Sequence, residues 1–384
     1  MDNEAERRYA EFTGARNAIF TSGGAGVALH GALVALLEPG RKVLSDRHVH
    51  RDVVASMITA GAEPVWLPSC WDDERQIPCP APVREIESAL DRDPQIRAVL
   101  VVTPTEHGIC ADLERLAAAC HRRDVPLLVD EERGGHFAFH PGLPTAAIEA
   151  GADIVVHHPL ANGETRPSVV LSGGGLVDAD LLRVSLDAHT GAEWPALDAY
   201  RETMSRHGCR LLDAALDRAE RIRERLAGVS GLTLLDQSII KCDGVAEWDP
   251  LTLTIDVSDL GITGWQARDC LRDDAWRADG RRVVRSLAGA DDAVETRVVD
   301  GLRSLAAAPP RPDRTAVAPP PGPQRMMSPR AAYLADSEPV ADPAGRISAD
   351  AFGPVIMPGE CFSAEVVRYL RAASPVPSFR VVRA

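Results

Sequence analysis

The chain has 384 residues, so two or three separate cores are expected rather than one. Hydrophobic residues make up 45% of it and charged residues 26%, which is ordinary for a globular protein. A net charge of −14 argues against general affinity for nucleic acid or anionic membranes, and no apolar run reaches the roughly 20 residues of a membrane span.

Basic residues are almost all arginine, and Lys42 and Lys241 are the two lysines of the whole chain. The N-terminus is acidic, whereas a signal peptide begins with a basic segment followed by an apolar run, so no signal peptide is expected. The eight cysteines are scattered, with no C-x-x-C pair. These features predict a reduced, cytoplasmic protein.

Residues 4–175 alternate between helical patterns and short apolar runs. Strands are expected at 42–45, 64–67, 96–102, 126–130 and 153–156, and helices at 25–37, 52–60, 83–90, 113–123 and 145–150. Apolar strands separated by helices are typical of a parallel sheet with both faces covered. The sequence therefore predicts a doubly wound, mostly parallel α/β fold.

The pattern changes after residue 175. Residues 177–228 are mostly helical and end in an amphipathic stretch at 211–226. Strands at 232–235 and 251–257 and helices at 264–272 and 293–305 predict a smaller α/β domain. A proline-rich stretch predicts an extended linker, and helices at 328–334 and 364–373 predict an α+β tail. The expected domains are 1–228, 229–307 and 325–384, with the linker at 308–324.

Polar residues follow the expected strands, where ligands bind in open parallel sheets. Those residues are His48, His50, Glu106, His107, Glu131, Glu132, His136, His157 and His158. One histidine in such a place is more often a cap or loop residue. Six of the eleven histidines share this placement, which predicts a pocket without defining its chemistry.

Long collinear stretches of the chain carry a family resemblance. They include FTGARNAIFTSGGAGVALHGALVALLEPGRKVLSDRHVHRDVV, VVTPTEHGICADLERLAAACHRRDVPLLVDEERGGHFAFHPGLP and AIEAGADIVVHH. LTLTIDVSDLGITGWQARDCLR and SPRAAYLADSEPVADPAGRISADAFGPVIMPGE extend the similarity toward the C-terminus. The chain resembles the bacterial ornithine/lysine/arginine decarboxylases, pyridoxal-phosphate (PLP) enzymes of fold-type I.

The resemblance implies a cofactor site. His50 would stack on the pyridine ring, and Asp130 would pair with the pyridinium nitrogen, which lets PLP accept electrons. Gly24, Ala25 and Gly26 would offer backbone N–H groups to the phosphate at a helix start. Outside this context Asp130 would be read as a cap or turn residue, and the glycines as tight packing.

The chain departs from the family at several of these points. The lysine that forms the Schiff base falls at Ala161, and no lysine lies nearby. The glycine turn lacks the family's hydroxyls, Arg133 stands where the family has a histidine, and 188–192 replace a hydroxyl-rich stretch. The family's N-terminal segment, which carries dimer contacts, is not found before Met1. Together these changes predict that internal-aldimine chemistry has been lost.

Three functional hypotheses remain open. The chain is a degenerate homologue that pairs with an active paralogue, or it forms a homodimer as fold-type I proteins generally do. Alternatively it is a repurposed enzyme that binds PLP or pyridoxamine phosphate (PMP) noncovalently, with His157 or His158 as the base acting on an amino-acid-like molecule.

A third hypothesis is a metal site formed by His48, His107, Glu132 and His136. A conventional decarboxylase with a different alignment is the remaining alternative.

Overall fold

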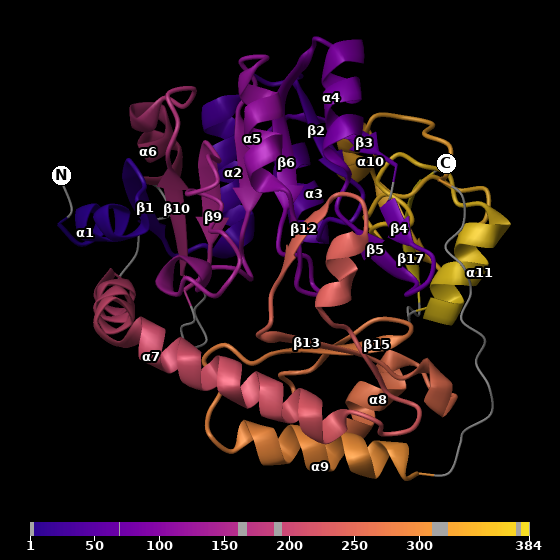
Figure 1. Cartoon of the computed structure of the whole chain (residues 1–384). Coiled ribbons are helices and arrows are strands. Elements are labelled where there is room, and N and C mark those ends of the chain that lie inside the picture. Colours follow the sequence, from indigo (N-terminus) through magenta and orange to yellow (C-terminus); the bar gives the residue numbers. More distant parts are fainter. Residues whose placement is uncertain are drawn as a thin grey trace.

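A computed structural model describes residues 4–68, 70–159, 167–187, 194–308, 322–373 and 378–383. Its centre is a seven-stranded sheet with the order β1-β10-β9-β8-β6-β2-β3 (Figure 1). In chain order these strands are β1 (Asn17–Thr21), β2 (Lys42–Asp46), β3 (Glu63–Leu67), β6 (Ile96–Val102), β8 (Leu127–Asp130), β9 (Ile154–His157) and β10 (Ser168–Ser172). The strands from β9 to β3 are parallel, whereas β10 and β1 join the edge antiparallel. The predicted mostly parallel α/β fold is confirmed.

Helices cover both faces of this sheet, which is why its middle strands are mostly apolar. One core joins the sheet to α2, α3 and α6, and a second core on the other face joins it to α1, α4 and α5. These helices are α1 (Glu4–Thr13), α2 (Gly24–Leu36), α3 (Arg51–Thr59), α4 (Val83–Arg92), α5 (Leu113–His121) and α6 (Ala179–Asp187).

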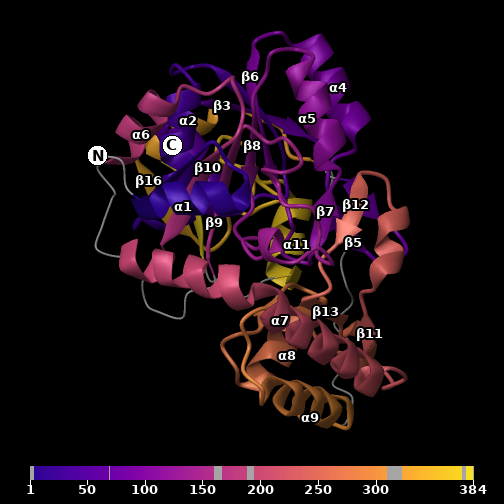
Figure 2. The same ribbon diagram turned by 60° about the vertical axis from the view of Figure 1, so that its left-hand side comes forward.

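A second sheet is antiparallel, with the order β11-β13-β15-β14. The long helix α7 crosses from the central sheet and shares a core with this sheet and with α8 and α9 (Figures 1 and 2). The elements are α7 (Trp194–Leu226), β11 (Thr233–Leu234), β13 (Thr252–Asp256), α8 (Gly264–Leu271), β14 (Arg277–Ala278), β15 (Arg282–Ser286) and α9 (Val294–Ala306).

Small elements join these parts. The hairpin β4 (Cys70–Asp72) and β5 (Ile77–Cys79) shares an apolar cluster with the 3-10 helix η2 (Gln237–Lys241) and with β7 (Ile109–Ala111), which pairs with β12 (Val245–Trp248). Two shorter 3-10 helices are η1 (Phe137–Phe139) and η3 (Ser258–Leu260).

The C-terminal part has its own core around Phe362 and Phe379. It consists of α10 (Pro329–Leu334), β16 (Ser337–Val340), α11 (Ala364–Ala373) and β17 (Phe379–Val382). Arg47, just after β2, docks this part on the central sheet. Its guanidinium donates to both carboxylate oxygens of Glu360 at 2.7 Å and to the carbonyl of Pro354 at 2.9 Å.

The predicted helix at 145–150 is wrong. One α-type bond forms there, from Ala150 N–H to Ala146 O at 3.0 Å, before Gly151 turns the chain at a φ of 97°. Glu131 and Glu247 accept the N–H groups of Ala147 and Thr145. The segment is therefore a single turn held by side chains of other elements.

The other predicted helices and strands are confirmed, with ends that agree within two residues. The sequence did not predict the antiparallel strands β1 and β10. Most of the predicted linker, residues 309–321, lies outside the described residues. Within the described part of the chain, no helix is both long and apolar enough to cross a membrane.

Candidate functional site

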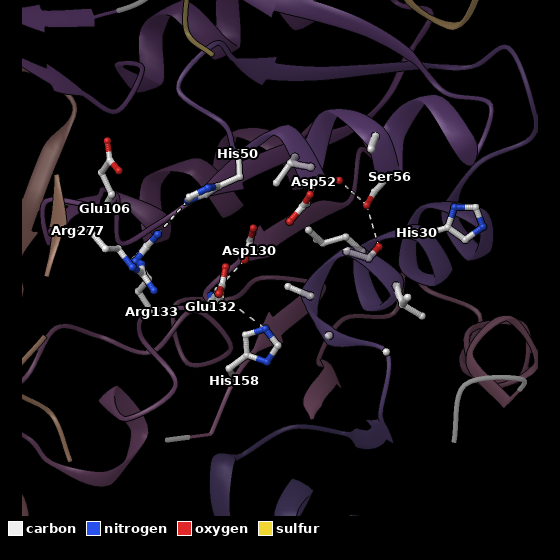
Figure 3. A pocket seen from close by; sticks show the side chains of 18 of the residues that line it. His30, His50, Asp52, Ser56, Glu106, Asp130, Glu132, Arg133, His158 and Arg277 are labelled. Atoms are coloured by element: carbon white, nitrogen blue, oxygen red, sulfur yellow. Dashed lines mark hydrogen bonds and ion pairs between the residues drawn. The ribbon is translucent and has the colours of Figure 1, made fainter. Parts of the chain in front are cut away.

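A pocket of about 1050 Å³ lies at the carboxyl ends of β2, β6, β8 and β9, beside the start of α2 (Figure 3). Its far wall comes from the second sheet and α8. Of the residues predicted from the sequence, the pocket brings together Gly24, Ala25, Gly26, His50, Glu106, Asp130, Glu132 and His158.

Asp130 is the last residue of β8, and its carboxyl is buried at the pocket floor. Among the described residues, one hydrogen bond reaches it, from Glu132 N–H to Oδ1 at 3.1 Å. Burial, together with the Glu132 charge, raises the pKa of Asp130 from 3.8 to about 7. A buried carboxyl with so few partners suits a cationic N–H group of a ligand.

His50 is the N-cap residue of α3, without a side-chain cap hydrogen bond, and its ring points into the pocket. Arg133 Nη2 donates to its Nε2 at 3.0 Å, so the ring proton resides on Nδ1. Arg133 thus orients the imidazole that the family resemblance assigns to ring stacking. Figure 3 shows Glu106 and Arg277 on the same side of the pocket.

The glycine turn begins α2 without a side-chain cap, since the N-cap residue is Gly23. The first N–H groups of α2 therefore have no side-chain cap, and Gly24, Ala25 and Gly26 lie on the pocket wall, where such groups could bind an anion. Ser56 of α3 donates to Gly26 O at 2.8 Å and so holds α3 against the turn. Asp52, one turn earlier on α3, lines the same space, and its negative charge opposes a phosphate there.

His157 and His158 are adjacent in the sequence, and their side chains point to opposite faces of the sheet because side chains alternate along a strand. His157 is buried away from the pocket, with Nε2 3.0 Å from Tyr9 Oη and Nδ1 3.8 Å from Glu131. His158 lines the pocket, and its Nδ1 donates to Pro167 O at 2.9 Å. Its Nε2 lies 3.9 Å from Glu132 Oε1, so His158 is the one of the two that could exchange a proton with a bound ligand.

The four predicted metal ligands are not brought together. Glu132 lines the pocket, whereas His48, His107 and His136 do not. Among the described residues, none of the six ring nitrogens of these three histidines has a hydrogen-bond partner. Burial lowers the pKa of His48 to about 4. Across the described ranges, no group of three or more His, Cys, Asp or Glu side chains could hold a metal ion.

Neither lysine is among the described residues that line the pocket. Lys42 begins β2, and its Nζ lies 2.7 Å from Asp93 Oδ2, while Lys241 ends η2. Ala161 and the stretch 188–192 lie outside the described residues.

The family model of the Orn/Lys/Arg decarboxylase major domain matches residues 1–256. The arginine decarboxylase of Halalkalibacterium halodurans is 30% identical, over 96% of this chain and 80% of its own length. The chain belongs to the Orn/Lys/Arg decarboxylase family. The arginine decarboxylase of Bacillus subtilis is a further relative of this decarboxylase-family chain, 29% identical over 96% of the chain and 80% of its own length.

Solved structures agree with the family on the fold. The E. coli constitutive lysine decarboxylase superposes with a TM-score of 0.74 at 16% identity, over 99% of this chain and 72% of that one. The ureidoglycine-glyoxylate aminotransferase of Bacillus subtilis has a TM-score of 0.62 at 16% identity, over 79% and 83% of the two chains. The fold is that of fold-type I PLP enzymes.

The residues of this family member fit PLP in part. Asp130 and His50 present a carboxyl and an imidazole to the pocket, as a pyridine ring requires. No lysine fits the covalent link, and Asp52 does not suit the phosphate.

Sequence reasoning missed the far wall of the pocket. It consists of Trp265, Arg268, Asp274, Trp276 and Arg277, from α8 and the segment leading into β14. Their sequence signal is weak, because only the folding of the second sheet over the first brings them to the site.

Proposed function

We propose that this member of the Orn/Lys/Arg decarboxylase family has left lysine-dependent PLP chemistry and acts as a degenerate homologue that pairs with another chain of its family. The observation that carries the proposal is the position of its two lysines. Lys42 is held by Asp93 at the start of β2, Lys241 ends η2, and neither lines the pocket. Without a lysine, a substrate amine cannot replace an enzyme amine on the cofactor.

An exposed apolar surface supports a partner chain. Four of the eight large hydrophobic side chains that are exposed in the described residues gather on α2, on α6 and just before α6, and these two helices pack together. They are Val34, Leu176, Leu181 and Val184. Apolar side chains that remain exposed on two packed helices support a protein–protein contact there. We infer a homodimer, or a heterodimer with a paralogue, through this surface.

Native mass spectrometry of the purified chain tests the partner. A dimer is expected, or a monomer that becomes a heterodimer on addition of an active family member. Val184→Glu places a charge at the most exposed of the four positions and should dissociate the complex. Leu334→Glu, at an exposed residue of α10, is the matched control. Dissociation by both variants or by neither would contradict this surface.

The loss of chemistry has a direct assay. Release of CO₂ from arginine, lysine and ornithine is measured with the full chain and excess PLP. We expect no release beyond that of PLP alone. Turnover that depends on the protein would overturn the proposal.

A second candidate is a lysine-independent enzyme that holds PLP or PMP noncovalently and acts on an amino-acid-like molecule. The specific support is the convergence of His50, Asp130 and His158 on one pocket. Asp130 would hold the ring nitrogen, and Nε2 of His158, next to Glu132, would accept a proton from the ligand.

Calorimetric titration with PMP tests this candidate. Binding is expected to weaken at least about tenfold in Asp130→Asn, the loss of one charged hydrogen bond. Asp46→Asn is the matched control, because Asp46 ends the neighbouring strand β2 but does not line the pocket. No heat of binding for the wild type, or equal weakening in both variants, would eliminate the candidate and leave the degenerate homologue.

A further inference from the structure

Two cysteines from distant parts of the chain face each other. Sγ of Cys79, the last residue of β5, lies 3.1 Å from Sγ of Cys242, the residue after η2. Cys79 is buried and Cys242 is half-buried, and both are free thiols. Neither belongs to the pocket described above.

The surrounding contacts hold the two sulfurs in place. Arg75, in the β4–β5 turn, donates to Ser238 Oγ at 2.8 Å, next to Ile77 and Ile239 in a shared apolar cluster. Gly244 has a φ of 84°, and a Cβ there would lie 2.6 Å from Pro80 O. Glycine thus allows the segment after Cys242 to approach β5 this closely.

A cleft borders one of the two cysteines. It has a volume of about 240 Å³, and Cys242 lines it together with Arg84, Asp112, Arg115 and Asp243. Cys79 is not among the described residues that line it. Burial raises the pKa of the Cys79 thiol, so Cys79 stays protonated next to the Cys242 sulfur.

We propose that Cys79 and Cys242 are a redox pair that hydrogen peroxide converts to a disulfide. The Cys242 sulfur attacks one peroxide oxygen, the O–O bond breaks, and the products are a sulfenic acid and water. The Cys79 sulfur then displaces the hydroxyl group, which leaves as a second water with the thiol proton. Two sulfurs together lose two electrons, and the two peroxide oxygens gain them.

A third cysteine is the competitor in this reaction. Cys70 lies opposite Cys79 in the β4–β5 hairpin, and its Sγ is 4.0 Å from Asp243 O. The direct sulfur contact at 3.1 Å makes Cys242 the partner of Cys79. A disulfide between Cys70 and either of these cysteines would be a different redox pair from the one proposed.

The linkage is mapped on the full chain. The protein is reduced with a phosphine, treated with one to five equivalents of hydrogen peroxide, blocked with N-ethylmaleimide and digested without reduction for mass spectrometry. We expect a peptide pair joining Cys79 to Cys242 in most chains, reversed by dithiothreitol. Complete alkylation of both, a bond that uses Cys70, or oxidation of Cys242 to sulfinic acid without a bond would overturn the proposal.

Variants separate this pair from general thiol oxidation. Cys242→Ser and Cys79→Ser should give no linked peptide, whereas Cys209→Ser, at an exposed cysteine on α7, should leave it unchanged. If substitution of a buried cysteine prevents folding, the peptide map of the oxidised wild type still tests the proposal. Peroxide should also raise the melting temperature of the wild type by several degrees, because the bond closes a long loop in the unfolded chain. An equal rise in Cys242→Ser would contradict the pair.

Discussion

Asp130 shows how a single buried carboxyl links the pocket to stability. Its pKa of about 7 means that the folded chain keeps a proton that the unfolded chain releases above about pH 4. Stability therefore falls as the pH rises from about 4 to 7, and the full penalty is present above pH 7. An Asn at this position keeps the acceptor for Glu132 N–H but carries no charge.

We predict that Asp130→Asn is more stable than the wild type at pH 8 and that this advantage shrinks toward pH 5. The upper limit is about 4 kcal/mol, from three pKa units at about 1.4 kcal/mol each. Urea unfolding at both pH values measures it. The pKa of Asp46 is also raised, to about 6, so Asp46 changes the stability of both proteins with pH. The variant is therefore compared with the wild type at each pH. A constant difference across this range would contradict the assigned pKa.

His157 and His158 mark a limit of sequence reasoning at this scale. Both follow from the sequence as candidate bases, and only one faces the pocket. Side chains alternate between the faces of a strand, so one of two neighbours had to point away. Which one depends on the helices that cover each face, and the sequence pattern does not fix that.

At the scale of elements, α8 places part of the far pocket wall through its first turn. Thr263 accepts Gln266 N–H with its hydroxyl at 3.3 Å, and Gln266 Oε1 accepts Thr263 N–H at 3.0 Å, which is a complete capping box. Trp265 and Arg268 follow directly on the pocket side.

We predict that Thr263→Ala destabilises the chain by about 1 kcal/mol, because Gln266 N–H in the first turn loses the hydroxyl that accepts it. The urea midpoint measures the loss. Thr263→Ser keeps the hydroxyl and should stay close to the wild type. Equal losses in the two variants would show that packing of the Thr263 methyl group, and not the cap, stabilises this turn.

The elements that the sequence predicted share one property. β6, β8 and β9 are apolar runs buried on both faces between amphipathic helices, so composition and period identify them. β1 and β10 pair antiparallel at one side of the sheet. The other strands were predicted because helical patterns separate them in the sequence, and no such pattern lies between β9 and β10. The turn at 146–150 has apolar residues at helical spacing, but Gly151 ends it after one bond.

At the scale of the whole molecule, the C-terminal part docks on the loop that carries His50. Arg47 and Glu360 are 12% and 6% exposed, and their paired contacts are buried in the junction. Arg51 pairs with Asp350 in the same junction, but Arg51 is 69% exposed. Arg47 therefore belongs to a buried ion pair and Arg51 to an exposed one, and the two can be compared within one junction.

We predict that Arg47→Ala lowers the free energy of unfolding by about 3–5 kcal/mol, since Glu360 is left as a buried charge without its cation. Arg51→Ala should cost less than about 1 kcal/mol, because its pair is open to solvent. Urea unfolding of both variants at pH 7 measures the difference. Similar losses in the two variants would mean that the junction does not depend on the buried pair.

The far wall of the pocket is also a property of the whole molecule. Trp276 and Arg277 lie more than 140 residues beyond Asp130, and no local pattern connects them. The polar residues after the strands were predictable because parallel strands share one carboxyl edge. The second sheet that closes over them was predictable as a unit, but its position was not.

The central claim is that this decarboxylase-family chain holds no lysine-linked cofactor, and borohydride trapping tests it most directly. The full chain is incubated with PLP, reduced with borohydride and digested, and labelled peptides are quantified against a urea-unfolded sample that reports nonspecific labelling. Ala161→Lys restores a lysine at the position that the resemblance assigns to it, and should gain a label if the pocket is otherwise intact. We predict no label on Lys42 or Lys241 of the wild type above the unfolded sample. Stoichiometric label on either lysine in the folded wild type would contradict the account.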